Sequence, residues 1–470
     1  MKSTFISSIL LAALLCSCGG SDPAAPETPV PAGPETEGPG GGEVPAETGV
    51  KVSSIEAFKA LGTLAPGTVV IWADGYYKNV TLDLDCSGTA SEPVVVRAET
   101  PGRVFFRGAS SVVLRGSHTE VNGFVFDEMD RSGNKDIVRF EKGSSFCKVS
   151  DCLLDGASTA EDASATSKWV RMYGTDNEFS GCTIRDKKDL GVTLELFPEG
   201  VSLRHKVLRN VFYHPVGHFS SGYSGINGQE IIRVGTSSVS MQEAFCEVSG
   251  NVFLECVGEN GEIISNKCCR NSYTSNVFEY CWGALTLRHG NGCTVSGNYF
   301  RGGKSAYEGG VRVIGEDHVV SGNYFRGLSG SGARSALSIM QGVENPELHE
   351  YFRVKNLKVE NNTFLDCAYS IYINLAGGSG DRVTTLPATG VTFTGNTVSC
   401  ASSSAYTVYM LKPESGGITW EGNRIWGGRQ YGTSLETLSA APTMPVFDSK
   451  VNAIKAAAGV SWERGKETEN

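Results

Sequence analysis

The sequence of 470 residues is poor in charged and in aromatic side chains, which make up 20% and 9% of it. Beyond the N-terminus it has no apolar run near the about 20 residues that a membrane-spanning helix needs. Glycine, in contrast, is abundant, with 58 residues. This composition predicts many short strands joined by tight turns rather than a helical protein.

The chain also lacks an excess of positive charge, since its formal net charge is −10 at pH 7. Proteins that bind nucleic acid usually present a basic surface to the phosphates, so nucleic acid is not an expected partner. An acidic polysaccharide remains compatible with this total, because binding of a polyanion depends on the local field and not on the net charge.

The first eighteen residues have the pattern of a lipoprotein signal peptide. Lys2 supplies a positive charge, residues 5–15 are apolar, and the run Leu15-Cys16-Ser17-Cys18 resembles a lipobox. Cys18 would then carry lipid as the first residue of the mature chain. The alternative is an ordinary signal peptide in which these cysteines are incidental.

A segment without large apolar side chains follows the signal peptide. Residues 19–49 are rich in Pro, Gly, Ala and Glu and cannot bury a core, so we expect a disordered linker. Residues 50–470 are expected to form a single domain. Together these features predict a protein of the bacterial cell envelope that touches the membrane only through lipid on Cys18.

Twelve cysteines remain after Cys18, an even number that permits disulfides in an exported protein. Cys182, Cys246 and Cys293 nevertheless occupy strand-like runs, which indicates a role as small buried apolar residues. The adjacent pair Cys268-Cys269 does not have the spacing of a zinc site.

One pattern recurs from residue 117 onward: alternating polar and apolar residues, then a small residue, an asparagine and two further residues, mostly apolar. Successive copies are 22 to 41 residues apart. Cys152 and Cys182 stand at the equivalent position in two copies. The other copies carry Asn122, Asn210, Asn251, Asn276, Asn298, Asn323, Asn362, Asn396 and Asn423.

This periodicity predicts a solenoid, in which neighbouring coils stack and share one core. Leucine-rich repeats would require regular leucines and a helix in each repeat, and the sequence has neither. The expected fold is therefore all-β, a right-handed parallel β-helix. The repeated asparagines are expected to form a side-chain ladder between coils and to tolerate the left-handed turn conformation.

A β-helix needs caps at its open ends. Ser53-Ser54-Ile55-Glu56 has the pattern of a capping box, and Ile55, Phe58 and Leu61 form one apolar stripe. This pattern predicts a short helix that plugs the N-terminal end. Residues 451–459 indicate a small last helix.

Cations recur at similar positions in three consecutive coils. Lys267, Arg288 and Arg312 lie 9, 10 and 11 residues before the asparagine of their own repeats. Because coils are roughly 4.8 Å apart, these side chains are expected to form a basic column on one face. Ile232-Arg233-Val234 repeats the alternation on the preceding coil.

Oxygen-bearing side chains lie next to this column in the sequence. Asn227, Glu259 and Glu262 offer the ligands that a hard cation such as Ca²⁺ prefers. Basic residues flanked by acids predict a site for a carboxylate-bearing sugar and a metal. The alternative is a solvated face on which the glutamates simply pair with the arginines.

Three ordered blocks stand out along the coils: Asn227-Gly-Gln-Glu230-Ile-Ile-Arg233, Gly258-Glu-Asn-Gly-Glu262-Ile-Ile-Ser-Asn-Lys267 and Leu287-Arg288-His289-Gly290. These blocks resemble polysaccharide lyase family 6, which contains alginate lyases and chondroitinase B. The resemblance extends from about residue 50 to about residue 430. It implies a parallel β-helix that cleaves an acidic glycan by β-elimination.

The resemblance implies roles for individual residues. Lys267 matches the Brønsted base of the family and Arg288 the general acid. Asn227, Glu259 and Glu262 fall at the calcium-ligand positions. The acidic block of the family usually reads Glu-x-Glu, whereas this chain has Glu259-Asn-Gly-Glu262, so either one residue is inserted or Asn260 replaces a carboxylate.

The remaining candidates bind substrate. Arg233 and Arg312 are expected to bind uronate carboxylates, with a structural role as the alternative. Because arginine has a very high pKa, Arg288 could instead stabilise charge on the leaving oxygen while water or His289 delivers the proton.

The chemistry of β-elimination needs such a site. Removal of the weakly acidic C5 proton is helped when Ca²⁺ or an arginine neutralises the neighbouring carboxylate. A lysine acts as base only if positive neighbours depress its pKa.

A glycoside hydrolase would need two carboxylates flanking the bond and is disfavoured. Alginate is the expected substrate, and dermatan or chondroitin sulfate is the alternative substrate. The alternative to an enzyme is a non-catalytic glycan-binding lipoprotein.

Overall fold

The structure is a computed structural model that describes residues 49–159, 165–213, 227–378 and 382–463. The signal peptide, Cys18 and nearly all of the expected linker lie outside these residues. The described residues belong to one compact unit, which begins at Thr48. Within them no helix is both long and apolar enough to cross a membrane.

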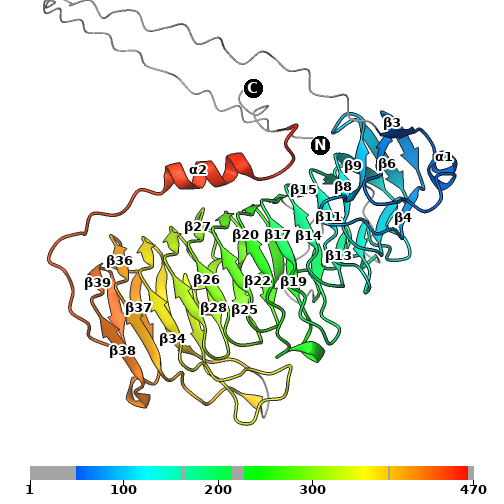
Figure 1. Cartoon of the computed structure of the whole chain (residues 1–470). Coiled ribbons are helices and arrows are strands. Elements are labelled where there is room, and N and C mark those ends of the chain that lie inside the picture. Colours follow the sequence, from blue (N-terminus) through cyan, green and yellow to red (C-terminus); the bar gives the residue numbers. More distant parts are fainter. Residues whose placement is uncertain (1–48, 160–164, 214–226, 379–381, 464–470) are drawn as a thin grey trace, which may run out of the picture. The chain divides into compact units, whose positions relative to one another are not determined.

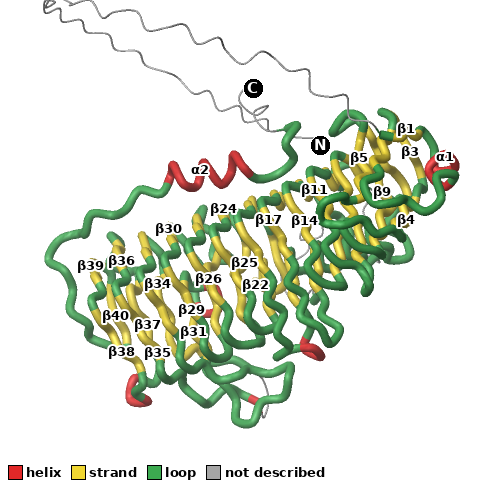
Figure 2. Tube along the Cα trace, in the orientation of Figure 1, coloured by secondary structure: helices red, strands yellow, loops and turns green. Residues whose placement is uncertain are grey.

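Short strands stack into three sheets in which every paired strand runs parallel to its neighbours (Figure 1). Each full coil gives one strand to each sheet in turn, so that strands three apart in the numbering pair with one another. This is a parallel β-helix, as the repeat predicts. Figure 2 shows how regularly strands and loops alternate along it.

Sheet A has 14 strands. They are β1 (Val50–Val52), β2 (Val69–Trp72), β5 (Val94–Ala98), β8 (Thr119–Asn122), β11 (Lys148–Ser150), β14 (Glu178–Ser180), β17 (Lys206–Leu208), β20 (Glu247–Ser249), β23 (Ser272–Thr274), β26 (Thr294–Ser296), β29 (Val319–Ser321), β32 (Lys358–Glu360), β35 (Val391–Thr394) and β38 (Ile418–Glu421).

Sheet B has 13 strands. They are β3 (Gly75–Lys78), β6 (Val104–Gly108), β9 (Phe124–Met129), β12 (Leu153–Asp155), β15 (Thr183–Arg185), β18 (Val211–Tyr213), β21 (Val252–Leu254), β24 (Val277–Glu279), β27 (Tyr299–Arg301), β30 (Tyr324–Arg326), β33 (Thr363–Leu365), β36 (Thr397–Cys400) and β39 (Arg424–Gly427).

Sheet C also has 13 strands. They are β4 (Thr81–Leu84), β7 (Ser111–Leu114), β10 (Val138–Phe140), β13 (Val170–Met172), β16 (Leu194–Leu196), β19 (Ile232–Val234), β22 (Val257–Asn266), β25 (Trp282–Leu287), β28 (Glu308–Val313), β31 (Leu337–Met340), β34 (Tyr369–Leu375), β37 (Tyr406–Met410) and β40 (Arg429–Tyr431).

The interior is filled by side chains that stack from coil to coil. Strand residues alternate between the core and the outside, so in-register positions place like side chains above one another. Six phenylalanines of sheet B stack with ring centroids 4.6 to 4.9 Å apart. They are Phe212, Phe253, Phe278, Phe300, Phe325 and Phe364.

The asparagine ladder is confirmed, and it runs beside this core between sheets A and B. In each rung the side-chain oxygen of one asparagine accepts the backbone N–H of the asparagine one coil earlier, at 2.9 to 3.0 Å. Because the ladder is buried, these bonds satisfy backbone groups at the corner that cannot reach water. Its members are Asn210, Asn251, Asn276, Asn298, Asn323, Asn362, Asn396 and Asn423.

Two details of the ladder differ from the sequence prediction. The left-handed residue is the one before each ladder asparagine, as in Ser275 and Gly297, and not the asparagine itself. Asn122 is not a rung, because it pairs in register with Ser150, two residues before Cys152. Cys182 does occupy the equivalent position, since its N–H donates to Asn210 at 2.9 Å.

All twelve cysteines between Cys86 and Cys400 are buried free thiols. The interpretation of cysteine as a small core residue is therefore confirmed for Cys182, Cys246 and Cys293. Burial raises the pKa of the Cys246 thiol to about 12, so it stays protonated and unreactive.

A short helix, α1 (Ile55–Lys59), lies at the N-terminal end of the coils. The Ser54 hydroxyl caps it by accepting the N–H of Ala57 at 3.1 Å. Phe58 is buried, with its ring centroid 5.8 Å from that of Trp72 in the first complete coil.

The last helix, α2 (Asp448–Ala457), follows the end of the coils. It packs along the outer face of sheet B and does not plug the C-terminal end (Figure 1). The chain then reaches back as far as β12 and β15, where Ser461 donates from its hydroxyl to Asp151 at 2.7 Å.

Candidate active site

One register position runs along the outer face of sheet C from coil to coil, and we call it the outer row. Its neighbours on each strand, such as Ile232 and Val234, are buried in the core, so the outer-row side chains face outward. The row comprises Arg139, Arg171, Glu195, Arg233, Ser265, Thr286, Arg312, Ser338, Tyr372, Tyr409 and Tyr431.

Lys267 and Arg288 share a second position two residues further along the strands. Each directly follows the end of its strand, and the backbone N–H of Arg288 donates to the carbonyl of Asn266 at 2.8 Å. The two residues therefore stand on adjacent coils of the same face. Arg312 belongs to the outer row with Arg233, so the expected basic column consists of two parallel positions rather than one.

A carboxylate that the sequence reasoning did not assign lies beside Lys267. Glu230 is fully buried, and its Oε1 is 3.6 Å from Lys267 Nζ. Neither carboxylate oxygen accepts a hydrogen bond from the described residues. Burial and the nearby charge of Glu259 raise the pKa of Glu230 to about 7.

Arg233 is held between two carboxylates. It forms an ion pair with Glu195 on the preceding coil, and a second with Glu230 at 3.7 Å. The guanidinium is largely buried and is engaged from both sides, which fixes the position of Glu230 next to Lys267.

A loop from the long coil between β31 and β32 covers Arg288 and Arg312. The guanidinium carbon of Arg288 lies 4.4 Å from the ring centroid of Tyr351, and that of Arg312 lies 5.7 Å from it. Arg312 also donates to the Tyr351 hydroxyl at 3.2 Å. Tyr351 thus links the two arginines across adjacent coils.

The same loop holds Arg288 through its backbone. Arg288 donates to the carbonyls of His349 and Glu350 at 3.1 and 3.3 Å. Glu350 is anchored in turn by Arg382, whose hydrogen bonds lower the pKa of that carboxyl to about 2. Burial lowers the pKa of Arg288 itself.

The expected calcium ligands divide between two sets of partners. Glu259 accepts the backbone N–H groups of Gly228 and Gln229, directly after Asn227. Glu262 accepts the Ser265 hydroxyl at 2.6 Å and an N–H of Arg312 at 3.4 Å. In the described parts of the chain no group of three or more His, Cys, Asp or Glu side chains is arranged to hold a metal ion.

Comparison with protein-family models places this chain within a known family. The model for chondroitinase B matches residues 52–397, which is most of the chain.

The chain belongs to the chondroitinase B family.

Solved structures show the same fold in relatives. The structure of the PL6 family alginate lyase AlyGC is 28% identical, with a TM-score of 0.77 over 89% of this chain and 57% of that one. The chondroitinase B-family chain described here therefore spans just over half the length of AlyGC. Comparison with curated proteins yields no match.

Two further structures support the fold alone. A mannuronic acid specific polysaccharide family 6 lyase from human gut microbiota is 24% identical, with a TM-score of 0.74 over 89% of this chain and 97% of that one. The PL6 family polysaccharide lyase Pedsa3628 from Pseudopedobacter saltans is 21% identical, with a TM-score of 0.71 over 88% and 99%.

His289 of this chondroitinase B-family chain is buried behind Arg288. Its Nε2 lies 3.4 Å from the Ser237 hydroxyl. Burial, followed by the charges of Arg288 and Lys267, lowers the pKa of the imidazole to about 2. The ring is therefore neutral near neutral pH and is a poor source of a proton.

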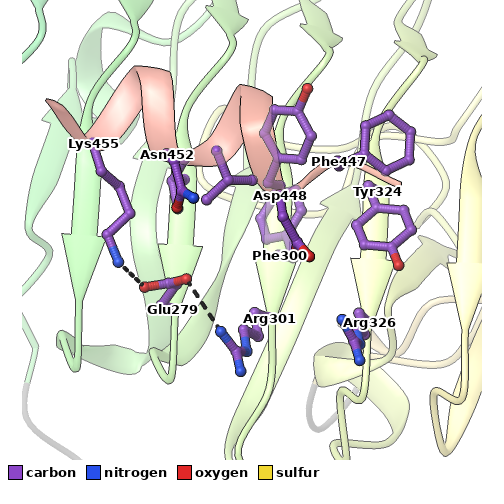
Figure 3. A pocket seen from close by; sticks show the side chains of 12 residues that line it. Glu279, Phe300, Arg301, Tyr324, Arg326, Phe447, Asp448, Asn452 and Lys455 are labelled. Atoms are coloured by element: carbon purple, nitrogen blue, oxygen red, sulfur yellow. Dashed lines mark hydrogen bonds and ion pairs between the residues drawn. The ribbon is translucent and has the colours of Figure 1, made fainter. Parts of the chain in front are cut away.

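A cavity of about 330 Å³ lies elsewhere, between α2 and the outer face of sheet B (Figure 3). Glu279 lies in it between Lys455 at 2.7 Å and Arg301 at 3.8 Å. None of the residues predicted from the sequence lines this cavity, so it is separate from the site on sheet C.

Sequence reasoning missed Glu230 and Tyr351. Glu230 stands inside the first block that resembles the lyase family. Its position three residues before Arg233 could have indicated that the two side chains pair with each other. Tyr351 is brought to the site by a loop insertion, and nothing in the repeat indicates where such a loop folds.

Proposed function

We propose that this protein is a polysaccharide lyase that cleaves alginate by β-elimination. The observation that carries the proposal is the placement of Lys267 and Arg288 at one register position on adjacent coils, beside Arg312. The 28% identical relative AlyGC is an alginate lyase, which favours alginate. The family model is that of chondroitinase B, so dermatan or chondroitin sulfate is the second candidate.

Lys267 is the proposed base. Its amine takes the C5 proton of a uronate, the electron pair of that C–H bond forms a double bond to C4, and the C4–O4 bond breaks. Charge that develops on O4 is stabilised by Arg288, whose position the backbone carbonyls of His349 and Glu350 fix. Water then protonates the departing O4, because His289 is neutral and buried.

Arg312 is the proposed partner of the uronate carboxylate. Its guanidinium is anchored by Glu262 and by the Tyr351 hydroxyl, so its orientation is set before substrate arrives. A fixed cation next to C5 stabilises the enolate-like transition state without a reorganisation cost. We assign Arg233, with its two ion pairs, to holding Glu230 in place.

Calcium is a proposed cofactor. Glu230 is buried near Glu259, its oxygens accept no hydrogen bond from the described residues, and its ion pairs with Lys267 and Arg233 are 3.6 and 3.7 Å long, so a further cation would stabilise it. Asn227, Glu230 and Glu259 would hold a Ca²⁺ ion there, and Glu262 would join them if it released Arg312. When bound, the ion would supply positive charge that neutralises a uronate carboxylate.

Chelation tests the calcium proposal. Metal analysis of the purified protein, followed by EDTA treatment and calcium add-back, should show one bound Ca²⁺ and a recoverable loss of activity. Glu259→Gln should weaken calcium binding, which isothermal titration measures directly. Full activity in metal-free protein would refute the role of calcium.

A panel of acidic glycans tests the function itself. Purified protein should release products with a C4–C5 double bond from alginate, detected by their ultraviolet absorbance and by mass spectrometry. Release from dermatan or chondroitin sulfate instead would support the second candidate. Binding of a glycan without any unsaturated product would contradict the lyase proposal and favour a non-catalytic protein.

A further inference from the structure

Aromatic side chains occupy the outer face of sheet C in its last three strands, β34, β37 and β40. We call this set the tyrosine platform. It consists of Tyr369, Tyr372, Tyr406, Tyr409, Arg429 and Tyr431.

The platform has two rows that follow the stacking of the coils. In the first row the ring of Tyr409 lies 4.7 Å from that of Tyr372 and 4.6 Å from that of Tyr431. In the second row the rings of Tyr369 and Tyr406 are 4.9 Å apart, and the guanidinium of Arg429 lies 4.0 Å from the Tyr406 ring. The result is a continuous aromatic surface that carries a cation.

We propose that the tyrosine platform is a distal subsite that binds the uronate chain several units away from the bond that is cleaved. This inference rests on the proposed lyase function and adds to it a preference for long substrates. It also commits the platform to one occupant, which is the same acidic polysaccharide that reaches Lys267 and Arg288.

Continuity with the active site is the first support. Tyr372, Tyr409 and Tyr431 belong to the same outer row as Arg312, with only Ser338 between Arg312 and Tyr372. Tyr372 is three coils from Thr286, or about 14 Å, and Tyr431 is five coils from it, or about 24 Å. Figure 1 shows β25, β28, β34 and β37 following one another along one face.

The two ends of the outer row differ in chemistry, which is the second support. Toward the N-terminal coils its side chains are already paired, since Arg171 contacts Asp136 and Glu195 while Glu195 also contacts Arg233. Toward the C-terminal coils none of the described residues hydrogen-bonds the hydroxyls of Tyr372, Tyr409 or Tyr431. A glycan chain therefore finds free donors on the C-terminal side.

Exposure and location give the third support. Tyr431 is 50% exposed, so one ring face is open, whereas the phenylalanine stack of sheet B is buried. On the same coils the outward residues of sheet A are polar, as in Lys358, Thr392 and Thr419. Stability alone does not require tyrosines on one sheet only.

The chemistry of the platform fits a polyuronate. Because the rings pack against one another, they offer mainly their hydroxyls, which donate to carboxylates and ring hydroxyls, and Arg429 adds a charge-assisted bond. The face of Tyr431 that Tyr409 does not cover can pack against the C–H face of a pyranose ring. One pyranose unit of a 1→4-linked chain is close in length to one coil spacing. Successive units can therefore meet successive coils.

Chain-length dependence tests the inference. The double variant Tyr409→Ala/Tyr431→Ala is compared with wild type on long alginate and on the shortest oligosaccharide that wild type cleaves. We expect kcat/KM on the polymer to fall about ten-fold because KM rises. This ten-fold change corresponds to about 1.4 kcal/mol. Activity on the short oligosaccharide should be unchanged. An equal fall on both substrates, or no fall on the polymer, would overturn the proposal.

Two further variants keep the test sharp. Tyr409→Phe/Tyr431→Phe retains ring packing, so a smaller polymer-specific loss would isolate the hydroxyls if the alanine variant folds poorly. Tyr76→Ala is the matched control, because Tyr76 lies on sheet B, away from the platform on sheet C. Tyr76 is also exposed, stacks on Phe105 at 4.8 Å and lies 4.4 Å from the Arg107 guanidinium. It should leave both activities unchanged.

Affinity electrophoresis separates failure of this inference from failure of the lyase proposal. Gels containing alginate or chondroitin sulfate should retard wild type and the Tyr76→Ala variant, and retard the platform double variant less. If wild type cleaves no glycan but its retardation still depends on the platform, the lyase proposal fails and the binding surface stands. Equal retardation of all variants would refute the platform.

Discussion

Replacement of Asn276 by alanine tests the asparagine ladder most directly. The Asn276 side-chain oxygen accepts two bonds from Asn251, one from its backbone N–H and one from its side-chain amide, both at 3.0 Å. Its own amide donates to the Val248 carbonyl and to Asn298, both at 2.9 Å. Alanine removes all four bonds at a site that water cannot reach.

The loss can be estimated from the backbone N–H of Asn251, which is left without an acceptor, whereas the Asn251 side-chain amide keeps the Val207 carbonyl at 2.8 Å. An unsatisfied buried donor costs about 1–3 kcal/mol, so Asn276→Ala should lower the free energy of unfolding by about 2 kcal/mol. Denaturant unfolding followed by circular dichroism measures this difference. Asn122→Ala is the control, because Asn122 lies outside the ladder and makes one part-buried bond to Ser150. Equal losses in the two variants would refute the reasoning.

Three further predictions concern pH, the covering loop and the membrane anchor. Burial lowers the pKa of His318 to about 4, so the unfolded chain binds a proton there that the folded protein does not, and this residue should contribute about 3 kcal/mol to the loss of stability as the pH drops from about 6.5 to 4. Burial lowers the pKa of His205 and His289 as well, so His318→Asn should remove only the share of His318 from this dependence in denaturation curves. Glu350→Gln should loosen the loop that carries Tyr351, raising KM several-fold and the rate of limited proteolysis while leaving the melting temperature nearly unchanged. We propose a lipid anchor on Cys18, so wild type should fractionate with bacterial membranes and Cys18→Ala should not; equal solubility would contradict it.

The repeat made the fold predictable because the same position must bond or pack against its equivalent in the next coil. Asparagine fills one such position from Asn210 to Asn423, and phenylalanine fills another in the core of sheet B. An asparagine side chain at the corner must bond the next coil, and this leaves a visible period in the sequence. The residue before it takes the left-handed conformation, as Ser275 and Gly297 do. The repeat pattern alone did not show which of the two neighbouring residues is left-handed.

The active site was predictable only in part, since its positions depend on turns of variable length. Counting back from the asparagines crosses the turn between sheets C and A, and that turn is longer after β25 than after β22 or β28. Arg312 therefore lies two residues from the position of Lys267 and Arg288 in the true register. Tyr351 and Glu350 reach the site through a loop, and such long-range contacts leave no local pattern.

Turnover of alginate by Lys267→Met and Arg288→Ala is the measurement that tests the central claim most directly. Both variants should fold like wild type by circular dichroism and lose at least about 100-fold in kcat, because a base and a charge-stabilising group are removed. Lys358→Met and Arg326→Ala, which change exposed cations on sheets A and B, should retain wild-type kcat. Near-normal formation of unsaturated product by either site variant would contradict the account.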